Sequence, residues 1–344
     1  MNPLASTIVM SSLTIGTITT LSSHHWLLAW AGLEINTLAM IPLMTQQHHP
    51  RSIEATVKYF LTQAAASALI LFSSINNAWH TGEWSIMDMS NATSTTTLTI
   101  ALCMKLGLAP FHFWLPEVLQ GLNLMTGLIL STWQKIAPMA LLLLTQNSLK
   151  PEILLTIGLT SALIGGWGGL NQTHLRKILA FSSIAHLGWM AVILTMAPKL
   201  AMLNFMIYLI TTTAMFLALK QTSSTKIKTL SSSWQKSPTI SSLSTLTLLS
   251  LGGLPPLSGF MPKWLIIQEL TKQNINMMAT VMALSALLSL FFYLRLSYTT
   301  SLTTHPGTSN TQMNFNQTSK QSSLFLAIMF SLSILLLPIT PLLT

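Results

Sequence analysis

Residues 104–117, MKLGLAPFHFWLPE, decide the fold that this sequence predicts. Lys105 stands inside an apolar run, and Gly107 and Pro110 follow it where a helix would otherwise continue. A break in a membrane helix releases backbone groups that need partners inside protein or water, because lipid offers none. The stretch therefore predicts an interrupted membrane helix with a buried charge beside the break.

The composition of the chain supports a membrane location. Of 344 residues, 50 % are hydrophobic and only 7 % are charged, and the mean hydropathy is +0.58. Soluble domains carry about 25 % charged residues. Recurring apolar runs of roughly 20 residues predict a helical bundle, since a β-barrel would show short alternating segments. We interpret the net charge of +9 as an orientation signal rather than a sign of nucleic-acid binding.

The apolar runs divide the chain into about eleven transmembrane helices. A further stretch, 257–272, continues the ninth run as a re-entrant or half-helical segment. The start of the chain shows no basic, Arg-rich or cleavable targeting segment. The predicted spans are 3–21, 25–44, 57–77, 95–115, 122–144, 152–170, 177–196, 200–219, 240–256, 276–297 and 324–343.

The basic residues fall unevenly on the two faces that this span count defines. The face that carries the N-terminus receives more of them, and that face is predicted to be the side from which the chain was inserted. Its residues are Arg51, Lys58, Arg176, Lys177, Lys220, Lys226, Lys228, Lys236, Arg295 and Lys320, whereas the opposite face receives Lys150, Lys199 and Lys272.

Five ionisable side chains fall at mid-membrane depth instead: Glu34, Lys105, Lys135, His186 and Lys263. Each lysine at the bilayer centre costs about 2.5–3.5 kcal/mol. One structural ion pair with Glu34 would leave two lysines uncompensated. Desolvation disfavours the ammonium form, and a nearby carboxylate opposes that effect. We therefore predict that these five side chains form a water-bridged proton relay with coupled charges.

A spacing found around the first break recurs later in the chain. Gly107, Pro110, Pro116 and Glu117 are matched 146 residues later by Gly253, Pro256, Pro262 and Lys263. The two motifs are five spans apart, an odd number, so the second half would start on the opposite face. This arithmetic predicts an inverted repeat with paired broken helices, an arrangement that marks transport sites. Simple helix kinks are the alternative.

The histidines leave their roles open. His186 lies mid-span, where a relay role, a structural hydrogen bond and haem ligation all compete. His112 would be the second axial ligand that a haem needs. Cys103 is the only cysteine, which excludes a disulfide framework and a cysteine-based cluster. No phosphate-binding glycine motif or metal-ligand cluster is present, so we expect no cofactor or metal on this chain.

The stretches MKLGLAPFHFWLPEVLQG (104–121) and LGGLPPLSGFMPKW (251–264), with Lys135 between them, closely resemble the antiporter-like subunits of respiratory complex I. The resemblance extends over essentially the whole chain. It implies relay roles for Glu34, Lys105, Lys135 and Lys263, and less securely for His186. It also implies that NADH, FMN, Fe–S clusters and ubiquinone belong to other subunits. One departure is that residues 276–297 carry no mid-span lysine or glutamate for proton exit.

The sequence thus predicts an all-α polytopic membrane protein of two inverted five-helix repeats, 1–149 and 150–297, followed by a loop and a C-terminal helix in 298–344. The resemblance implies the mitochondrial inner membrane, with the N-terminus in the matrix and the C-terminus in the intermembrane space. Its expected partners are a neighbouring antiporter-like chain, small core membrane subunits, accessory subunits and phospholipid or cardiolipin. The alternatives are a stand-alone cation/proton antiporter and a scaffold subunit that does not pump.

Overall fold

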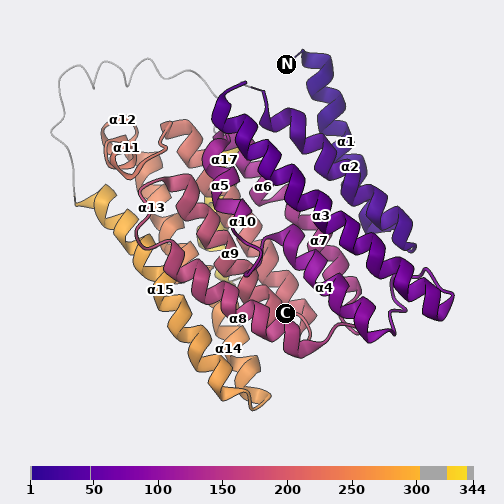
Figure 1. Ribbon diagram of the computed structural model, residues 1–344. Helices are drawn as coiled ribbons and strands as arrows, with labels where there is room; N and C mark the ends of the chain where they lie inside the picture. The colour runs from indigo at the N-terminus through magenta and orange to yellow at the C-terminus, as the bar shows by residue number, and fades with distance from the viewer. Residues whose placement is uncertain (1, 47, 303–323, 339–344) are drawn as a thin grey trace. The chain divides into compact units, whose positions relative to one another are not determined.

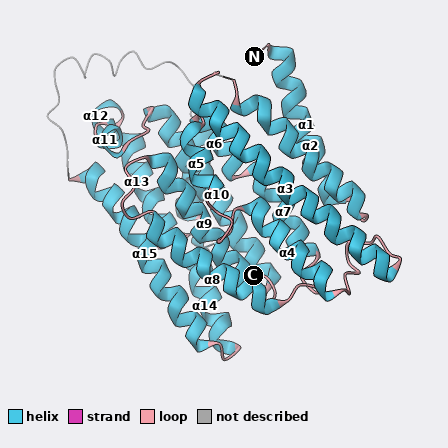
Figure 2. Ribbon diagram, in the orientation of Figure 1, coloured by secondary structure: helices cyan, strands magenta, loops and turns pink. Residues whose placement is uncertain are grey.

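The computed structural model describes residues 2–46, 48–302 and 324–338, and regular structure in this part of the chain is helical (Figure 2). The chain forms two compact units. The first comprises Met1–Ser161 with Ala191–Pro198, and the second comprises Ala162–Met190 with the described part of Lys199–Thr344. The division falls within α8 and α9 and after Pro198, the first residue of α10.

The first unit is built on α1 to α7 and the start of α8, drawn in indigo to magenta in Figure 1. Helices α2, α3 and α4 follow one another as packed neighbours, and α3 also packs against α5. The bounds are α1 Pro3–Ser22, α2 Trp26–Met44, α3 Pro50–Thr81, α4 Ala92–Leu106, α5 Trp114–Gly121, α6 Leu124–Ser131, α7 Trp133–Leu144 and α8 Pro151–Gly168.

The second unit contains the end of α8 and most of the remaining helices. Here α13 packs against α15, and α14 packs against α15 as well. The C-terminal helix joins this unit through Phe330, which is buried against α10 residues Ala214 and Ala218. The bounds are α9 Leu175–Ile193, α10 Pro198–Thr222, α11 Ile227–Ser231, α12 Ser233–Lys236, α13 Pro238–Gly252, α14 Phe260–Lys272, α15 Asn276–Ser301 and α17 Leu324–Leu335.

The helix starts follow from local side-chain chemistry. Imidazole Nδ1 of His25 accepts a hydrogen bond from the Leu27 N–H at the start of α2, at 3.2 Å. His49 caps α3 in the same way through the Arg51 N–H, with Pro50 as the first helical residue. A proline there loses no helical hydrogen bond. These two histidines thus serve as helix caps.

Small residues let helices approach closely within each unit. A Cβ built on Gly16 of α1 would lie 2.9 Å from the Gly32 carbonyl oxygen of α2. In the second unit, a Cβ on Gly165 would lie 2.6 Å from the Ala185 backbone nitrogen. Close approach through small residues is how membrane helices gain packing contacts without a hydrophobic driving force.

Six described helices are long and apolar enough to cross a membrane, judged by length and composition. Helices also form at the positions of the other predicted spans, but they do not meet this criterion. One of the six candidate spans, Leu124–Leu144, is divided at Thr132 into α6 and α7, a break that its apolar sequence does not reveal. The segment 220–239, which is rich in Ser, Thr and Lys, contains α11 and α12 with Leu230 buried. Residues 303–323 and 339–344 of the predicted C-terminal segment lie outside the described part of the chain.

Candidate functional site

The first helix break is made at Gly107. Helix α4 ends there in the left-handed conformation, with φ +79°. The Gly107 N–H donates to the Cys103 and Met104 carbonyls, and the Leu108 N–H donates to Cys103 at 3.0 Å. Glycine adopts this conformation without the steric cost that a side chain would add. The chain then turns and restarts as α5 at Trp114.

The second break has the same backbone geometry. Helix α13 ends at Gly253 with φ +80°, and the Gly253 N–H donates to the Leu249 and Ser250 carbonyls. The Leu254 N–H donates to Leu249. Each partner lies 146 positions after its counterpart in the first break, and α14 restarts at Phe260, as α5 does at Trp114. The similarity between the two motifs therefore extends from sequence spacing to hydrogen bonding.

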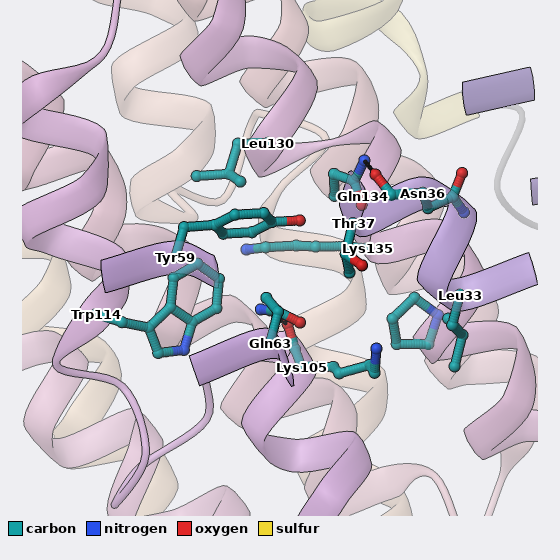
Figure 3. Close-up of a pocket in the computed structure, with 11 residues that line it drawn as sticks. Leu33, Asn36, Thr37, Tyr59, Gln63, Lys105, Trp114, Leu130, Gln134 and Lys135 are labelled. Atoms are coloured by element: carbon teal, nitrogen blue, oxygen red, sulfur yellow. Dashed lines mark hydrogen bonds between the residues drawn. The ribbon is translucent and has the colours of Figure 1, made fainter. Parts of the chain in front are cut away.

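Lys105 and Lys135 line one small internal cavity of the first unit (Figure 3). Lys105 comes from the last turn of α4, and Lys135 comes from the first turn of α7, directly after the interruption at Thr132. Both are buried, with exposed fractions of 5 % and 3 %. The cavity volume is ≈ 20 Å³, which is room for about one water molecule. Its other lining residues are Leu33, Asn36, Thr37, Tyr59, Gln63, Trp114, Leu130, Gln134 and Pro138.

Amide side chains line the same cavity. Gln63 of α3 donates to the Lys105 carbonyl at 3.4 Å, and Gln134 donates to the Asn36 carbonyl at 3.2 Å. Nζ of Lys105 is fully buried and has no hydrogen-bond partner among the described residues. A buried ammonium without a partner is costly, so a water molecule in the adjoining cavity is the group that would satisfy it.

Glu34 lies on α2 and does not itself line the cavity, although its neighbours Leu33 and Asn36 do. Its Oε2 atom is buried without a hydrogen-bond partner among the described residues. The carboxylate interacts electrostatically with Lys105 and Tyr59. No ion pair within 4.0 Å joins it to a described lysine. The first unit thus brings Glu34, Lys105 and Lys135 into one neighbourhood without direct contact between acid and base.

Lys263 belongs to the second unit and crosses the second break. It is 8 % exposed, and its Nζ donates to the Gly252 carbonyl, the last of α13, at 2.9 Å. A positive charge at this position complements the partial negative charge of a helix C-terminus. Gly253 makes room for it, because a Cβ there would lie 3.0 Å from both Cδ and Nζ of Lys263.

The two histidines lie in different surroundings. The His186 ring of α9 packs near the Tyr208 ring of α10, with centroids 5.7 Å apart, in the second unit. His112 lies in the turn after the first break, is 5 % exposed, and packs on Phe113 with centroids 4.3 Å apart. Within the described residues, no group of three or more His, Cys, Asp or Glu side chains could hold a metal ion.

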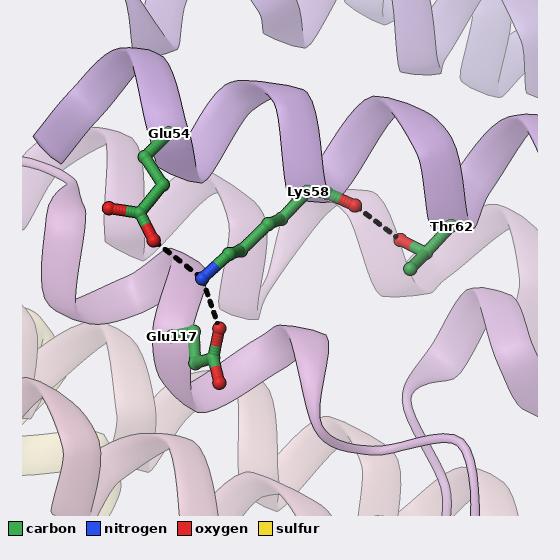
Figure 4. Close-up of polar contacts among 4 residues, drawn as sticks. All are labelled: Glu54, Lys58, Thr62 and Glu117. Atoms are coloured by element: carbon green, nitrogen blue, oxygen red, sulfur yellow. Dashed lines mark hydrogen bonds and ion pairs between the residues drawn. The ribbon is translucent and has the colours of Figure 1, made fainter. Parts of the chain in front are cut away.

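An ion cluster joins α5 to α3 (Figure 4). Nζ of Lys58 lies 2.6 Å from Glu54 in its own helix and 2.6 Å from Glu117 in α5. At the next position along α3, Tyr59 packs on Trp114 with ring centroids 5.9 Å apart. The Trp114 indole N–H donates to the Met104 carbonyl at 3.3 Å, so this hydrogen bond links α5 to α4 across the break.

Two of the predicted residues, Lys105 and Lys135, line this cavity together with neutral residues that the sequence analysis did not single out. Gln63, Gln134 and Tyr59 carry no charge that would make them conspicuous in an apolar run. Gln63 had a detectable signal, since it is a polar amide inside the predicted span 57–77. A polar amide at such a depth marks an internal polar contact.

Comparisons with known proteins agree on one class. The family model for the membrane part of NADH:quinone oxidoreductase/Mrp antiporters matches residues 23–289. The chain is similar to the respiratory complex I structure from Thermus thermophilus with bound aureothin, with a TM-score of 0.86 and 26 % identity. That match covers 100 % of this chain and 81 % of the other chain. Helical fold and broken-helix site thus define an antiporter-like membrane protein.

More specific matches extend over the full chain. The model for the C-terminus of NADH dehydrogenase subunit 2 matches residues 290–344. NADH-ubiquinone oxidoreductase chain 2 of Xenopus laevis is 66 % identical over 342 residues, covering 99 % of both chains. The protein of the same name from Squalus acanthias is 62 % identical over 341 residues, covering 99 % of this chain and 98 % of the other.

The chain therefore belongs to the NADH-ubiquinone oxidoreductase chain 2 family, the antiporter-like membrane subunits of mitochondrial respiratory complex I. The predicted resemblance of this sequence to the antiporter-like subunits of complex I is confirmed. Membership makes the chain one subunit of a larger assembly.

Proposed function

We propose that this subunit moves protons through a hydrated path made by Glu34, Lys105, Lys135, His186 and Lys263. Glu34 tunes the charge of Lys105, and Lys105 exchanges a proton with Lys135 through water in the shared cavity. His186 and Lys263 continue the path in the second unit. Charge changes that accompany redox chemistry elsewhere in the complex drive the transfer.

One observation carries this proposal: two buried lysines from separate helices line the same cavity, and the Lys105 ammonium lacks a hydrogen-bond partner among the described residues. A purely structural lysine would be expected to have a fixed partner, because burial of an unpaired charge is costly. Ionisable groups within membrane segments usually mark proton or ion pathways.

The architecture proposed for the path is a pair of inverted halves, 1–149 and 150–297, within about eleven spans. The matched hydrogen bonds at Gly107 and Gly253 support this repeat. The excess of basic residues supports a matrix location for the N-terminal face, with the C-terminus in the intermembrane space. Residues 298–344 then form the last loop and span.

The remaining chemistry is assigned to other subunits. NADH oxidation, FMN, the Fe–S clusters and ubiquinone reduction lie outside this chain in our proposal. A neighbouring antiporter-like chain, small core membrane subunits, accessory subunits and phospholipid surround it. Helix α15 contains Arg295 as its only charged residue, and this arginine donates to the Leu170 and Gln172 carbonyls. We therefore place no exit residue on α15.

The test replaces Lys105 by Met in the assembled complex, which keeps the bulk of the side chain and removes its charge. We expect normal assembly, with fewer protons translocated per NADH oxidised by complex reconstituted in sealed vesicles. Lys150→Met, at an exposed position, is the matched control and should pump normally. Full pumping by an assembled Lys105→Met complex would refute the proposed path.

A further inference from the structure

One buried tyrosine is shared by the acid and the lysines of the first unit. Tyr59 of α3 is 2 % exposed, and it lines the cavity of Lys105 and Lys135 (Figure 3). Glu34 lies outside that lining, yet its carboxylate interacts electrostatically with both Tyr59 and Lys105. Tyr59 therefore belongs both to the surroundings of the acid and to the cavity of the two bases.

The cavity lining contains few other groups that could carry a proton. A hydroxyl accepts and donates through one oxygen atom, so it can take up one proton and release another. Amides such as Gln63 and Gln134 donate through nitrogen and accept through oxygen, so a proton passed through them would leave a different tautomer. Thr37, the other hydroxyl in the lining, already donates to the Glu34 carbonyl at 2.8 Å. Tyr59 is therefore the lining side chain best suited to relay a proton.

The ring of Tyr59 is held by the helix that follows the first break. It packs on Trp114 with ring centroids 5.9 Å apart, and the Trp114 indole N–H donates to the Met104 carbonyl at 3.3 Å. The O–H can still rotate about its bond to the ring. The hydroxyl can thus turn from one hydrogen-bond partner to another while the ring stays in place.

The second unit repeats this arrangement. Tyr208 of α10 is 1 % exposed, and the centroids of the Tyr208 and His186 rings lie 5.7 Å apart. His186 is on α9 and Tyr208 is on the next helix, just as Glu34 is on α2 and Tyr59 is on α3. Tyr208 follows Tyr59 by 149 positions, close to the 146 that separate the two breaks. Each unit thus contains a buried tyrosine that interacts with an ionisable residue of the preceding helix.

We infer that Tyr59 and Tyr208 are proton-relay residues, one in each unit. This assignment rests on the proposed proton path, and it adds the group that joins Glu34 to the cavity of the lysines. In the second unit, the Tyr208 hydroxyl passes the proton of the His186 imidazolium onward in the same way.

The transfer in the first unit balances without any further reactant. Water carries a proton from the Glu34 carboxyl group to the Tyr59 oxygen, while the Tyr59 O–H gives its own hydrogen to the water in the cavity. That water then protonates a neutral lysine amine of the cavity. Glu34 ends as a carboxylate and the lysine as an ammonium, whereas Tyr59 and the water are restored.

Removal of the hydroxyl alone tests this role in the complex reconstituted in sealed vesicles. Tyr59→Phe keeps the aromatic ring on Trp114 and deletes the relaying oxygen. Loss of a positioned proton-transfer group slows transfer by about 10²–10⁴-fold, so the number of protons translocated per NADH oxidised should fall to the value of the Lys105→Met complex. The thermal dissociation temperature should stay at that of the parent complex. Tyr298→Phe is the matched control and should pump normally, because Tyr298 is 56 % exposed on α15.

The Lys105→Met complex separates failure of the relay from failure of the path. Normal pumping by Tyr59→Phe beside a deficient Lys105→Met complex would overturn the relay role and leave the proposed path intact. Normal pumping by both would overturn the path and the relay together. An equal loss in Tyr298→Phe would also overturn the relay, since the loss would not depend on a buried hydroxyl. If Tyr59→Phe does not assemble, Tyr208→Phe takes its place under the same criteria.

Discussion

At the residue scale, the buried lysines depend on particular glycines and carbonyls. Lys263 donates to the Gly252 carbonyl, and its stem passes over Gly253, where a Cβ would lie 3.0 Å from Cδ and Nζ. Lys105 is held differently, because its own ammonium has no described partner while its backbone carbonyl accepts from Gln63. Two lysines at matching breaks are thus stabilised by unlike means.

Gly253→Ala should lower both the stability and the pumping of the complex. A side chain in the left-handed conformation costs about 1–2 kcal/mol, and the new methyl group would also displace Nζ of Lys263. Gly82→Ala is the control, since Gly82 has φ +77° and a Cβ placed on it would meet nothing within 4 Å. The thermal unfolding temperature should fall in both variants. The number of protons translocated per NADH oxidised should fall only in Gly253→Ala. Equal pumping losses in the two variants would contradict this assignment.

At the element scale, α5 is an eight-residue helix held mainly by α3. Its contacts lie along one face of α3, at Arg51, Ala55, Lys58 and Tyr59. The ion cluster is exposed, with side-chain fractions of 41 % for Lys58 and 53 % for Glu117. Exposed ion pairs contribute little, about 0–1 kcal/mol. Close packing at Gly121 should therefore stabilise α5 more than its charges do.

Gly121→Ala should destabilise the subunit more than Glu117→Gln. A Cβ on Gly121 would lie 2.7 Å from the Arg51 carbonyl oxygen and 2.8 Å from the Ala55 Cβ, and neither atom belongs to a flexible side-chain end. Overpacking of this kind costs about 1–3 kcal/mol, whereas loss of the exposed pair costs less than about 1 kcal/mol. The thermal dissociation temperature of the assembled complex measures the destabilisation caused by each of the two substitutions. A larger drop for Glu117→Gln would show that charge, not packing, fixes α5.

At the scale of the whole molecule, charge asymmetry and buried polarity serve different ends. In the proposed topology, the basic residues near span ends orient the chain in the membrane, since the positive-inside rule acts through short loops. The mid-membrane charges do not contribute to that count. Each unit contains one glycine-terminated break of the same geometry, and each break has one of the buried lysines beside it.

The orientation can be measured with single cysteines. Asn147→Cys should react with an impermeant thiol reagent added to sealed mitoplasts, because its loop is predicted to face the intermembrane space. Gln221→Cys, in a predicted matrix loop, should react only after the membrane is opened. Both positions are exposed, and the native Cys103 is fully buried and provides a low background. The reverse pattern of labelling would invert the proposed topology.

The sequence alone determined the class of protein, the positions of the long apolar helices and the two glycine-terminated breaks. These properties depend on local chemistry: apolar length sets a membrane helix, and glycine followed by proline ends one. It also identified the buried ionisable residues by their cost in lipid. Neighbouring loops were less predictable, as α11 and α12 within the polar segment 220–239 illustrate.

Only the tertiary structure decided which groups meet. Lys105 and Lys135 line one cavity with Gln63 and Gln134, whereas Glu34 lies outside its lining. This arrangement depends on the rotation and register of the packed helices. The contact of Lys263 with the Gly252 carbonyl likewise crosses a break whose turn must first be formed. Helical periodicity fixes which residues share a face but not which face of a neighbouring helix they will contact, because that choice is made by packing across the whole unit.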